Sequence, residues 1–388
     1  MKITKVSALG LRLPLNHAPY VTEGAGTKNE WGRLTRFFPK RPEPNLEYVI
    51  VSIETDEGIV GYGEAPVDIV FFGETVEQVC AAINDYLGPQ FIGQDPFQRE
   101  RLLHLVDYPG NTCSKSALDM ALHDLVGKAL NTPIYNLLGG LNRSKIPVAI
   151  EVSGGEPEDM AERCKVMVKK GVRAFKPKIG GIVEKDIERL NAIREAVGTD
   201  ISLRVDANQG YSVKEAILFC KLAEDNHINL ELLEQPVERW NLQGLAEVRA
   251  AVNLPIEADE SCCTLTDAMQ IIRHNAADVL NIKPGKCGGL FKARKIAAVA
   301  EAAGLKCVIG TAFGLGLERA AKLHLAASTI SITHAVEFTE IDLHPCLLEE
   351  PGESNLSFPL KDGMLIVPDG PGLGVNFDFE KAKEYSLT

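Results

Sequence analysis

The chain has 388 residues, of which 45% are hydrophobic and 24% are charged, and its formal net charge is −12. This size and composition are ordinary for a soluble enzyme with one large and one smaller domain. The negative charge argues against nucleic acid or acidic membranes as partners. Because no apolar run reaches the roughly 18 residues of a membrane span and the start of the chain lacks a signal-peptide core, we expect a cytoplasmic protein. The nine scattered cysteines favour reduced thiols.

The first ~125 residues predict an α+β domain. Alternating apolar stretches at 3–13 and 48–65 are typical of antiparallel strands, and Glu57-Gly58 within the second stretch is a hairpin signal. Between them lies a polar and aromatic segment from about residue 16 to 47. A loop of this length is usually disordered or functional, so we expect a lid that selects the substrate, with a plain surface insertion as the alternative. The candidate substrate contacts in this domain are Tyr20, Trp31, Arg36, Phe71 and Phe72.

A strongly amphipathic helix at 114–130 opens a region in which strand and helix patterns alternate. The expected strands are 146–150, 174–179, 201–207, 230–235, 255–259, 278–283, 306–310 and 335–340. Eight strands with seven intervening helices favour a closed βα barrel over an open sheet. We therefore expect an N-terminal domain over 1–125, a barrel over 126–345 and a Pro- and Gly-rich segment over 346–388 that returns to the N-terminal domain.

Five residues suited to metal binding and proton transfer recur in the barrel region. They are Lys178, Asp206, Glu234, Asp259 and Lys283, they lie 24–28 residues apart, and each ends a short apolar run. A strand, a loop and a helix together take about that many residues. Five successive parallel strands would therefore each deliver one reactive side chain to the C-terminal face of the barrel, where active sites are built.

Three carboxylates on adjacent strand ends suit a hard divalent cation. Mg²⁺ takes oxygen ligands in octahedral geometry, and Mn²⁺ accepts the same ligands. Zinc is disfavoured because no His or Cys stands at a matching strand end. Any one of these acids alone would be read as a salt bridge or a helix cap, but three in register argue for a metal site. We assign Asn208 and Glu260, which flank two of the acids, to hydrogen bonds that orient the ligands.

Lys176 and Lys178 lie two apart in one apolar strand, so both side chains point the same way, which in a barrel is inward. An interior lysine near a second ammonium group and a divalent cation loses its proton more easily and can act as a general base. Lys283 stands beyond three intervening strands and would approach from across the barrel. The alternatives are ion pairing with the acids for the first two lysines and a cap to a glycine-rich turn for Lys283.

Other signals are weaker. The turn at 283–290 could cradle a phosphate, although its glycines more simply allow tight strand-to-helix packing. His324 reads as a core residue. Cys113 and Cys287 are poor candidates for a nucleophile. Glu337 and Glu340 stand at the last strand end and could contact a cationic group of a substrate or pair with nearby lysine or arginine.

Taken together, these residues resemble the enolase superfamily, and within it the muconate-lactonising subgroup of the mandelate racemase/muconate lactonizing enzyme family. The resemblance rests on the helix up to residue 130, NLLGG, the Lys-x-Lys strand, RVDAN, EQP, ADES and NIKPGKCGG, and it covers nearly the whole chain. It implies an α+β cap on a (β/α)7β barrel, which is a modified TIM barrel. It also implies Mg²⁺ ligation by the three acids, an acid/base pair of Lys178 and Lys283, and assistance at the substrate carboxylate by Lys176.

Two departures from the family pattern bear on the reaction. Pro177 occupies the middle of Lys-x-Lys, removes a ladder donor and predicts a local irregularity in that strand. Gly314 stands where muconate-type members have a Glu, and the Asp-x-Asp pattern of dipeptide epimerases is absent after the last strand.

We therefore expect a Mg²⁺-dependent isomerase that moves the α-proton of a small carboxylate substrate through an enolate. The first expectation is a muconate-type cycloisomerase. The alternatives are a racemase or epimerase of an N-acyl amino acid, dipeptide or related derivative, then a hydroxy-acid dehydratase. Rivals from other classes are an anion-binding barrel without turnover and an aldolase with a Schiff-base lysine. From the family resemblance we also expect a homo-oligomer.

Overall fold

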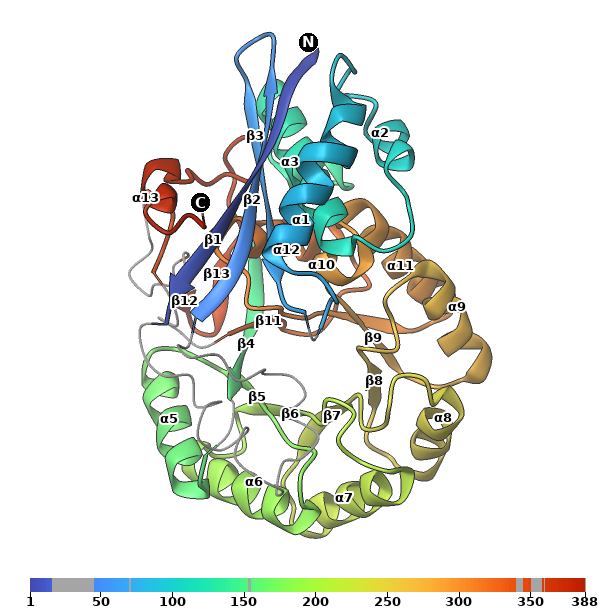
Figure 1. The fold of residues 1–388 in the computed structure, drawn as a ribbon. Helices are drawn as coiled ribbons and strands as arrows, with labels where there is room; N and C mark the ends of the chain where they lie inside the picture. The colour runs from blue at the N-terminus through green and yellow to red at the C-terminus, as the bar shows by residue number, and fades with distance from the viewer. Residues whose placement is uncertain are drawn as a thin grey trace.

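The computed structural model describes residues 1–15, 45–69, 71–152, 155–339, 345–349, 358 and 360–387. Within these residues, eight parallel strands form a barrel with helices outside it, and an antiparallel sheet with its own helices forms a cap (Figure 1). The fold is the (β/α)7β barrel with an α+β cap that the sequence predicts. Among the helices of this described part, none combines the length and apolar composition needed to cross a bilayer.

The cap is built on a three-stranded sheet in the order β1-β2-β3, and helical segments follow it along the chain. The elements are β1 (Ile3–Pro14), β2 (Asn45–Thr55), β3 (Val60–Val67), α1 (Val76–Ala81), the π-helical turn η2 (Ala82–Leu87), the 3-10 turn η3 (Gly88–Phe91), α2 (Arg99–Leu105), α3 (Thr112–Ala129) and α4 (Ile134–Leu137). The predicted hairpin is confirmed, because β2 and β3 pair antiparallel and Gly58 turns between them with φ +76°.

The barrel strands pair in the order β11-β4-β5-β6-β7-β8-β9-β10. They are β4 (Lys145–Val152), β5 (Ala174–Pro177), β6 (Ser202–Asp206), β7 (Leu230–Glu234), β8 (Ile256–Ala258), β9 (Val279–Ile282), β10 (Lys306–Ile309) and β11 (Val336–Phe338). The ring closes through Cys307 of β10, whose amide donates to the Ser331 carbonyl at 2.8 Å and whose carbonyl accepts from the Thr333 amide at 3.2 Å.

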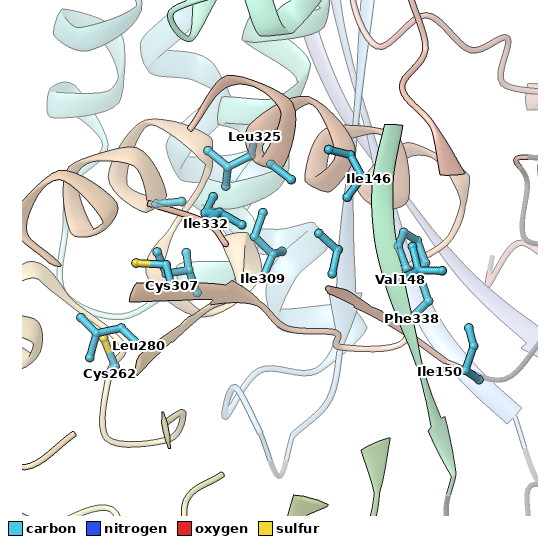
Figure 2. Packing of buried hydrophobic residues seen from close by; sticks show 14 of the residues in the cluster. Ile146, Val148, Ile150, Cys262, Leu280, Cys307, Ile309, Leu325, Ile332 and Phe338 are labelled. Carbon is cyan, nitrogen blue, oxygen red and sulfur yellow. The ribbon is translucent and has the colours of Figure 1, made fainter. Parts of the chain in front are cut away.

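Helices surround the strands and cover their outer faces. They are α5 (Pro157–Lys169), α6 (Val183–Val197), α7 (Val213–Asp225), α8 (Leu242–Ala251), α9 (Leu265–His274), α10 (Pro284–Cys287), α11 (Leu290–Ala302) and α12 (Gly316–Ser328). The period of two along a strand sends alternate residues outward. Ile146, Val148 and Ile150 of β4 follow this rule and lie in the main hydrophobic cluster with Leu325 of α12 and Phe338 of β11 (Figure 2).

The C-terminal segment touches both parts of the molecule. It contains β12 (Leu360–Lys361), β13 (Met364–Ile366) and α13 (Phe379–Lys383). β13 pairs antiparallel with the start of β4, and Ser386 bridges to Leu11 of β1. The predicted boundaries at residues 125 and 345 stay a prediction.

Two local details of the fold, the burial of α3 and the strand at Pro177, bear on the sequence predictions. Helix α3, for which the sequence suggests one apolar stripe, is buried from Cys113 to Gly127 on every side because it packs between β3 and α10. Pro177 has the predicted effect. The ladder between β5 and β6 stops after Phe175, and only an isolated bridge between Lys178 and Asp206 continues it.

A buried carboxylate from the cap holds the barrel loop after β10. Glu64 of β3 is fully buried and accepts hydrogen bonds from the backbone amides of Leu315 (2.5 Å) and Glu318 (3.0 Å) at the start of α12. The Tyr48 hydroxyl donates to the Phe313 carbonyl of the same loop at 2.7 Å. Burial raises the pKa of Glu64 to about 8, and the nearby Glu318 carboxylate adds to the rise. The cap and this loop are therefore joined by fixed polar contacts.

The raised pKa predicts a pH dependence of stability. The folded protein keeps the Glu64 proton up to about pH 8, whereas the unfolded chain releases it near the ordinary value for glutamic acid, so stability falls as pH rises between the two. From pH 5 to pH 8 the free energy of unfolding of the wild type should fall by on the order of 2–3 kcal/mol more than that of Glu64→Gln. Urea unfolding at both pH values measures this. Glu54→Gln, at the surface of β2, is the control, and equal pH dependence in wild type and Glu64→Gln would contradict the buried proton.

Candidate active site

The structure brings the five predicted residues together at one end of the barrel. Asp206 and Glu234 are the last residues of β6 and β7, and Asp259 follows β8 directly. Lys178 and Lys283 follow β5 and β9. These five strands are neighbours in the sheet and run parallel, so their C-terminal ends meet in one mouth.

The two lysines of β5 reach the same acid. Lys176 Nζ lies 3.2 Å and Lys178 Nζ lies 2.7 Å from Asp206 Oδ2, so both point into the barrel as predicted. The Lys176 side chain is only 1% exposed, and it also contacts Glu234 Oε2 at 3.0 Å and Glu337 Oε2 at 2.7 Å. The Lys178 side chain is 15% exposed and also lies 3.3 Å from Glu151 Oε1. Lys176 is therefore the inner lysine, and Lys178 is the one at the mouth.

Lys283 stands on the other side of the mouth. Its Nζ lies 2.5 Å from Asp259 Oδ2 and 5.8 Å from the centre of the Phe71 ring. Phe71 comes from the segment after β3, so the cap contributes to the surroundings of this lysine. Phe72 is only partly buried and packs against the hydrophobic core of the cap. The strands β6, β7 and β8 separate Lys178 from Lys283, as predicted for two groups that face each other.

In Asp206, Glu234 and Asp259, the two carboxylate oxygens accept hydrogen bonds from two different kinds of donor. The first oxygen is held by a donor fixed in the scaffold, and the second is held by Lys176, Lys178 or Lys283. The fixed contacts are Asn208 N to Asp206 Oδ1 at 2.8 Å, Asn281 Nδ2 to Glu234 Oε1 at 3.1 Å, and Lys286 Nζ to Asp259 Oδ1 at 2.6 Å. Positive charge therefore already lies against at least one oxygen of each acid, and against both oxygens of Asp259.

This donor set fits a hard divalent cation. All three groups are buried carboxylates, which are the ligands that Mg²⁺ prefers, and each offers one oxygen held only by lysine ammonium groups among the described residues. A second group of acids, Glu234, Glu257 and Glu337, has carboxylate oxygens within 4.8 Å of one another. Lys176 lies between Glu234 and Glu337 of this group, as it does between Asp206 and Glu234 at the strand ends.

The side chains of Asn208 and Glu260 meet beside these acids. Asn208 Nδ2 donates to Glu260 Oε1 at 3.1 Å, while Glu260 Oε2 is buried and has no hydrogen-bond partner among the described residues. Burial raises the pKa of Glu260 to about 7, and the Asp259 and Asp206 carboxylates add to the rise. These two side chains bond each other and the backbone amide of Asn208 bonds Asp206, so the orienting role of the side chains stays a prediction.

The protein's own charges keep the lysines protonated. Burial lowers the pKa of Lys178, but the carboxylates of Asp206 and Glu151 outweigh it and the pKa is raised overall. The pKa of Lys283 is raised for the same reason by Asp259. Burial raises the pKa of Asp206, yet Lys178 and Lys176 bring it down to about 2. These directions hold without a cation, and the easy loss of a lysine proton, which was expected beside a bound cation, stays a prediction.

A second layer of polar residues lies below the site, and only Glu337 among them was a predicted residue. Arg204, Glu257, Asn281 and Glu337 are all fully buried, and Asn281 Nδ2 bridges Glu234 and Glu257. Arg204, Glu257 and Asn281 each precede a predicted site residue by two positions. The period of two along a strand could therefore have placed them inside the barrel. Leu232, Val279 and Val308 form a separate small apolar cluster on the barrel strands.

Several weaker predictions are also decided. Glu337 is fully buried and pairs with Lys176 and Arg204 (3.3 Å), which contradicts contact with a cationic substrate group and agrees with the ion-pair alternative. His324 is a core residue, as predicted, and burial lowers its pKa to about 4. A side chain at Gly289 would meet Asp119, so the turn at 283–290 serves tight packing. Tyr20, Trp31, Arg36 and Glu340 lie outside the described residues.

All nine cysteines are free thiols, and burial raises the pKa of both Cys113 and Cys287. This disfavours either residue as a nucleophile, because the thiolate is the reactive form.

Comparison with known proteins identifies the family models and relatives that this chain matches. The family model described as "Enolase C-terminal domain-like" matches residues 159–382, and "Mandelate racemase / muconate lactonizing enzyme, N-terminal domain" matches residues 43–139. The N-succinyl-L-Arg/Lys racemase of Bacillus cereus is 33% identical over 394 residues, covering 100% of this chain and 98% of the relative. A chloromuconate cycloisomerase of Cupriavidus necator is 34% identical over 345 residues, covering 87% and 91%.

A solved structure adds the ligands seen in a relative. The dipeptide epimerase from Enterococcus faecalis V583, complexed with Mg and the dipeptide L-Leu-L-Tyr, is 34% identical. It superposes with a TM-score of 0.84 and covers 97% of this chain and 100% of that chain.

In this chain, steric crowding explains the glycine at position 314, in the loop after β10. A Cβ on Gly314 would lie 2.1 Å from Glu318 Oε2, and the Glu318 side chain is buried and paired with Lys322 at 3.3 Å. A larger residue at this position therefore has no room unless Glu318 moves.

Gly314→Ala should consequently destabilise the protein by about 1–3 kcal/mol through overpacking. The double variant Gly314→Ala/Glu318→Ala should lose at least about 0.5 kcal/mol less than the sum of the two single changes, because it removes the two closest atoms, Glu318 Oε2 and Cδ, and leaves only the Cβ contact at 2.8 Å. Urea unfolding of all four proteins measures the difference. Strictly additive losses would show that Glu318 is not the obstacle.

Proposed function

The chain belongs to the mandelate racemase/muconate lactonizing enzyme family of the enolase superfamily and is an isomerase, and from this premise we propose that it racemises or epimerises an amino-acid derivative. The substrate class is a small carboxylate whose α-carbon carries an acylated nitrogen, as in an N-acyl amino acid or a dipeptide. This reverses the order expected from the sequence, which put muconate-type cycloisomerisation first. The match to the Bacillus cereus racemase over the whole chain and the loss of the muconate-type Glu at Gly314 both support the change.

The observation that carries the proposal is the pair of lysines on two sides of one cluster of acids. Lys178 is held by Asp206 on β6, and Lys283 is held by Asp259 after β8, with three strands between the lysines. Inversion at a carbon needs a base on one face and an acid on the other, and two facing amines meet this need.

The three strand-end acids would hold the cation, which we propose to be Mg²⁺, with Mn²⁺ as a substitute. When bound, it supplies Lewis-acid stabilisation of the negative charge that develops on the substrate carboxylate as the α-proton leaves. The ligands would be Asp206, Glu234 and Asp259, each through the oxygen that a lysine now contacts.

The lysines then divide the remaining work. The unprotonated Nζ of one outer lysine accepts the α-proton, and the ammonium group of the other donates a proton to the opposite face. Lys176, held by three carboxylates, stays an ammonium group and stabilises charge on the substrate carboxylate. Phe71, together with Tyr20, Trp31 and Arg36 of the predicted lid, is our candidate for contacts with the rest of the substrate.

A cycloisomerase is the second candidate, supported by the chloromuconate relative. Both are tested by incubating the purified protein with Mg²⁺ and panels of N-succinyl amino acids, dipeptides and cis,cis-muconates in D₂O. For at least one N-succinyl amino acid or dipeptide, the proposal expects deuterium at the α-carbon and the appearance of the second stereoisomer. NMR monitors the deuterium incorporation. Turnover of muconates alone would overturn it.

Replacing either outer lysine should stop inversion. Lys178→Ala and Lys283→Ala should each lower kcat for racemisation by about 10²–10⁴-fold, because each removes one proton-transfer group. Each variant should lose α-proton exchange from the isomer whose proton faces the missing amine. Lys165→Ala, on the exposed face of α5, is the control. Full exchange of both isomers by Lys178→Ala would refute the assignment.

A further inference from the structure

A fourth lysine, which the sequence signals did not single out, is built into the same mouth. Lys286 lies in α10, three residues after Lys283, and its side chain is only 8% exposed. Its ammonium group donates to Asp259 Oδ1 at 2.6 Å, to the Asp259 carbonyl at 2.6 Å and to the Asn281 carbonyl at 3.0 Å. Three acceptors therefore satisfy the three donors of one ammonium group.

The two backbone carbonyls make this contact rigid. One belongs to the residue after β8 and the other to β9, so Lys286 ties the C-terminal ends of two neighbouring barrel strands. Its own backbone is fixed in a tight turn, in which the Lys286 amide donates to the Lys283 carbonyl at 3.0 Å and Gly288 takes φ +83°. An ammonium group held in this way cannot follow a substrate.

Lys283 is held differently, although it contacts the same carboxylate. Among the described residues its ammonium group makes one hydrogen bond, to Asp259 Oδ2. If that oxygen turns to another cation, Lys283 is released, whereas Lys286 keeps Oδ1 and both carbonyls. The two lysines thus have separate tasks on the two oxygens of one acid.

We propose that Lys286 is a positioning residue that holds Asp259 so that Oδ2 alone is offered to the divalent cation. This rests on the proposed function, in which Asp259 is a ligand. Lys286 also remains as the permanent counter-charge of Asp259 when Lys283 turns toward the substrate. Without Lys286, the Asp259 carboxylate can rotate about its side-chain bonds. Cation binding then has to fix this carboxylate in place, which weakens the binding free energy.

The test measures metal affinity and fold stability separately on the full chain. Calorimetric titration with MgCl₂, without substrate, compares wild type with Lys286→Met and Lys286→Gln. Lys295→Met, a charge loss at the surface of α11, is the matched control. Thermal unfolding without added metal reports any purely structural loss, and the titrations are made well below the lowest melting temperature.

Loss of an orienting partner typically weakens metal binding by about 10–100-fold, and we expect this for both Lys286 variants with the control unchanged. Gln can keep bonds to the carbonyls but not the charge on Asp259, so it tests positioning even if Lys286→Met fails to fold. Wild-type affinity in Lys286→Gln, with or without a lower melting temperature, would overturn the proposal. A wild type that binds no Mg²⁺ would instead count against the proposed function.

Discussion

The arrangement of the molecule depends on the balance of buried charge in the barrel mouth. Seven carboxylates and five cations lie there within the described residues, and most are nearly inaccessible to water. They are Glu151, Asp206, Glu234, Glu257, Asp259, Glu260 and Glu337, with Lys176, Lys178, Arg204, Lys283 and Lys286. Burying an unpaired charge costs several kcal/mol, so each group is tolerated only because its neighbours compensate it. The site is thus a network whose members set one another's charge and position.

Within that network, rigidity decreases from the interior to the mouth. Arg204, Glu337 and Lys176 lie in the interior, where each contacts groups fixed on neighbouring strands. Lys178 and Lys283, nearer the mouth, contact acids that a cation would engage instead. The same set of charges can therefore hold a metal and free two amines for proton transfer. In metal-activated proton transfer, fixed charges stabilise the developing anion and mobile amines move the proton.

The cap supplies contacts around the substrate that can select one reaction, which the barrel charges alone do not do. Racemases, epimerases and cycloisomerases are all among the relatives, so an enolate-forming mouth alone does not select one reaction. Selection has to come from the groups that surround the substrate. Here Glu64 and Tyr48 hold the loop after β10, Glu318 occupies the space beside Gly314, and Phe71 approaches Lys283 from the cap. Glu64, Tyr48 and Phe71 thereby join the cap to the barrel at the loop after β10 and beside Lys283.

The sequence by itself determined the barrel, the order in which successive strands carry reactive residues, and the five side chains at the mouth. It could do so because the spacing of βα units and the period of two in strands are local properties. Only the tertiary structure decided which oxygens pair with which amines. Lys286 acts between two barrel strands and Glu64 between cap and barrel, and no local pattern distinguishes either from surface or core residues. The choice between the two expectations for Glu337, and the raised pKa of the lysines without a cation, likewise depend on charges that distant strands deliver to one buried volume.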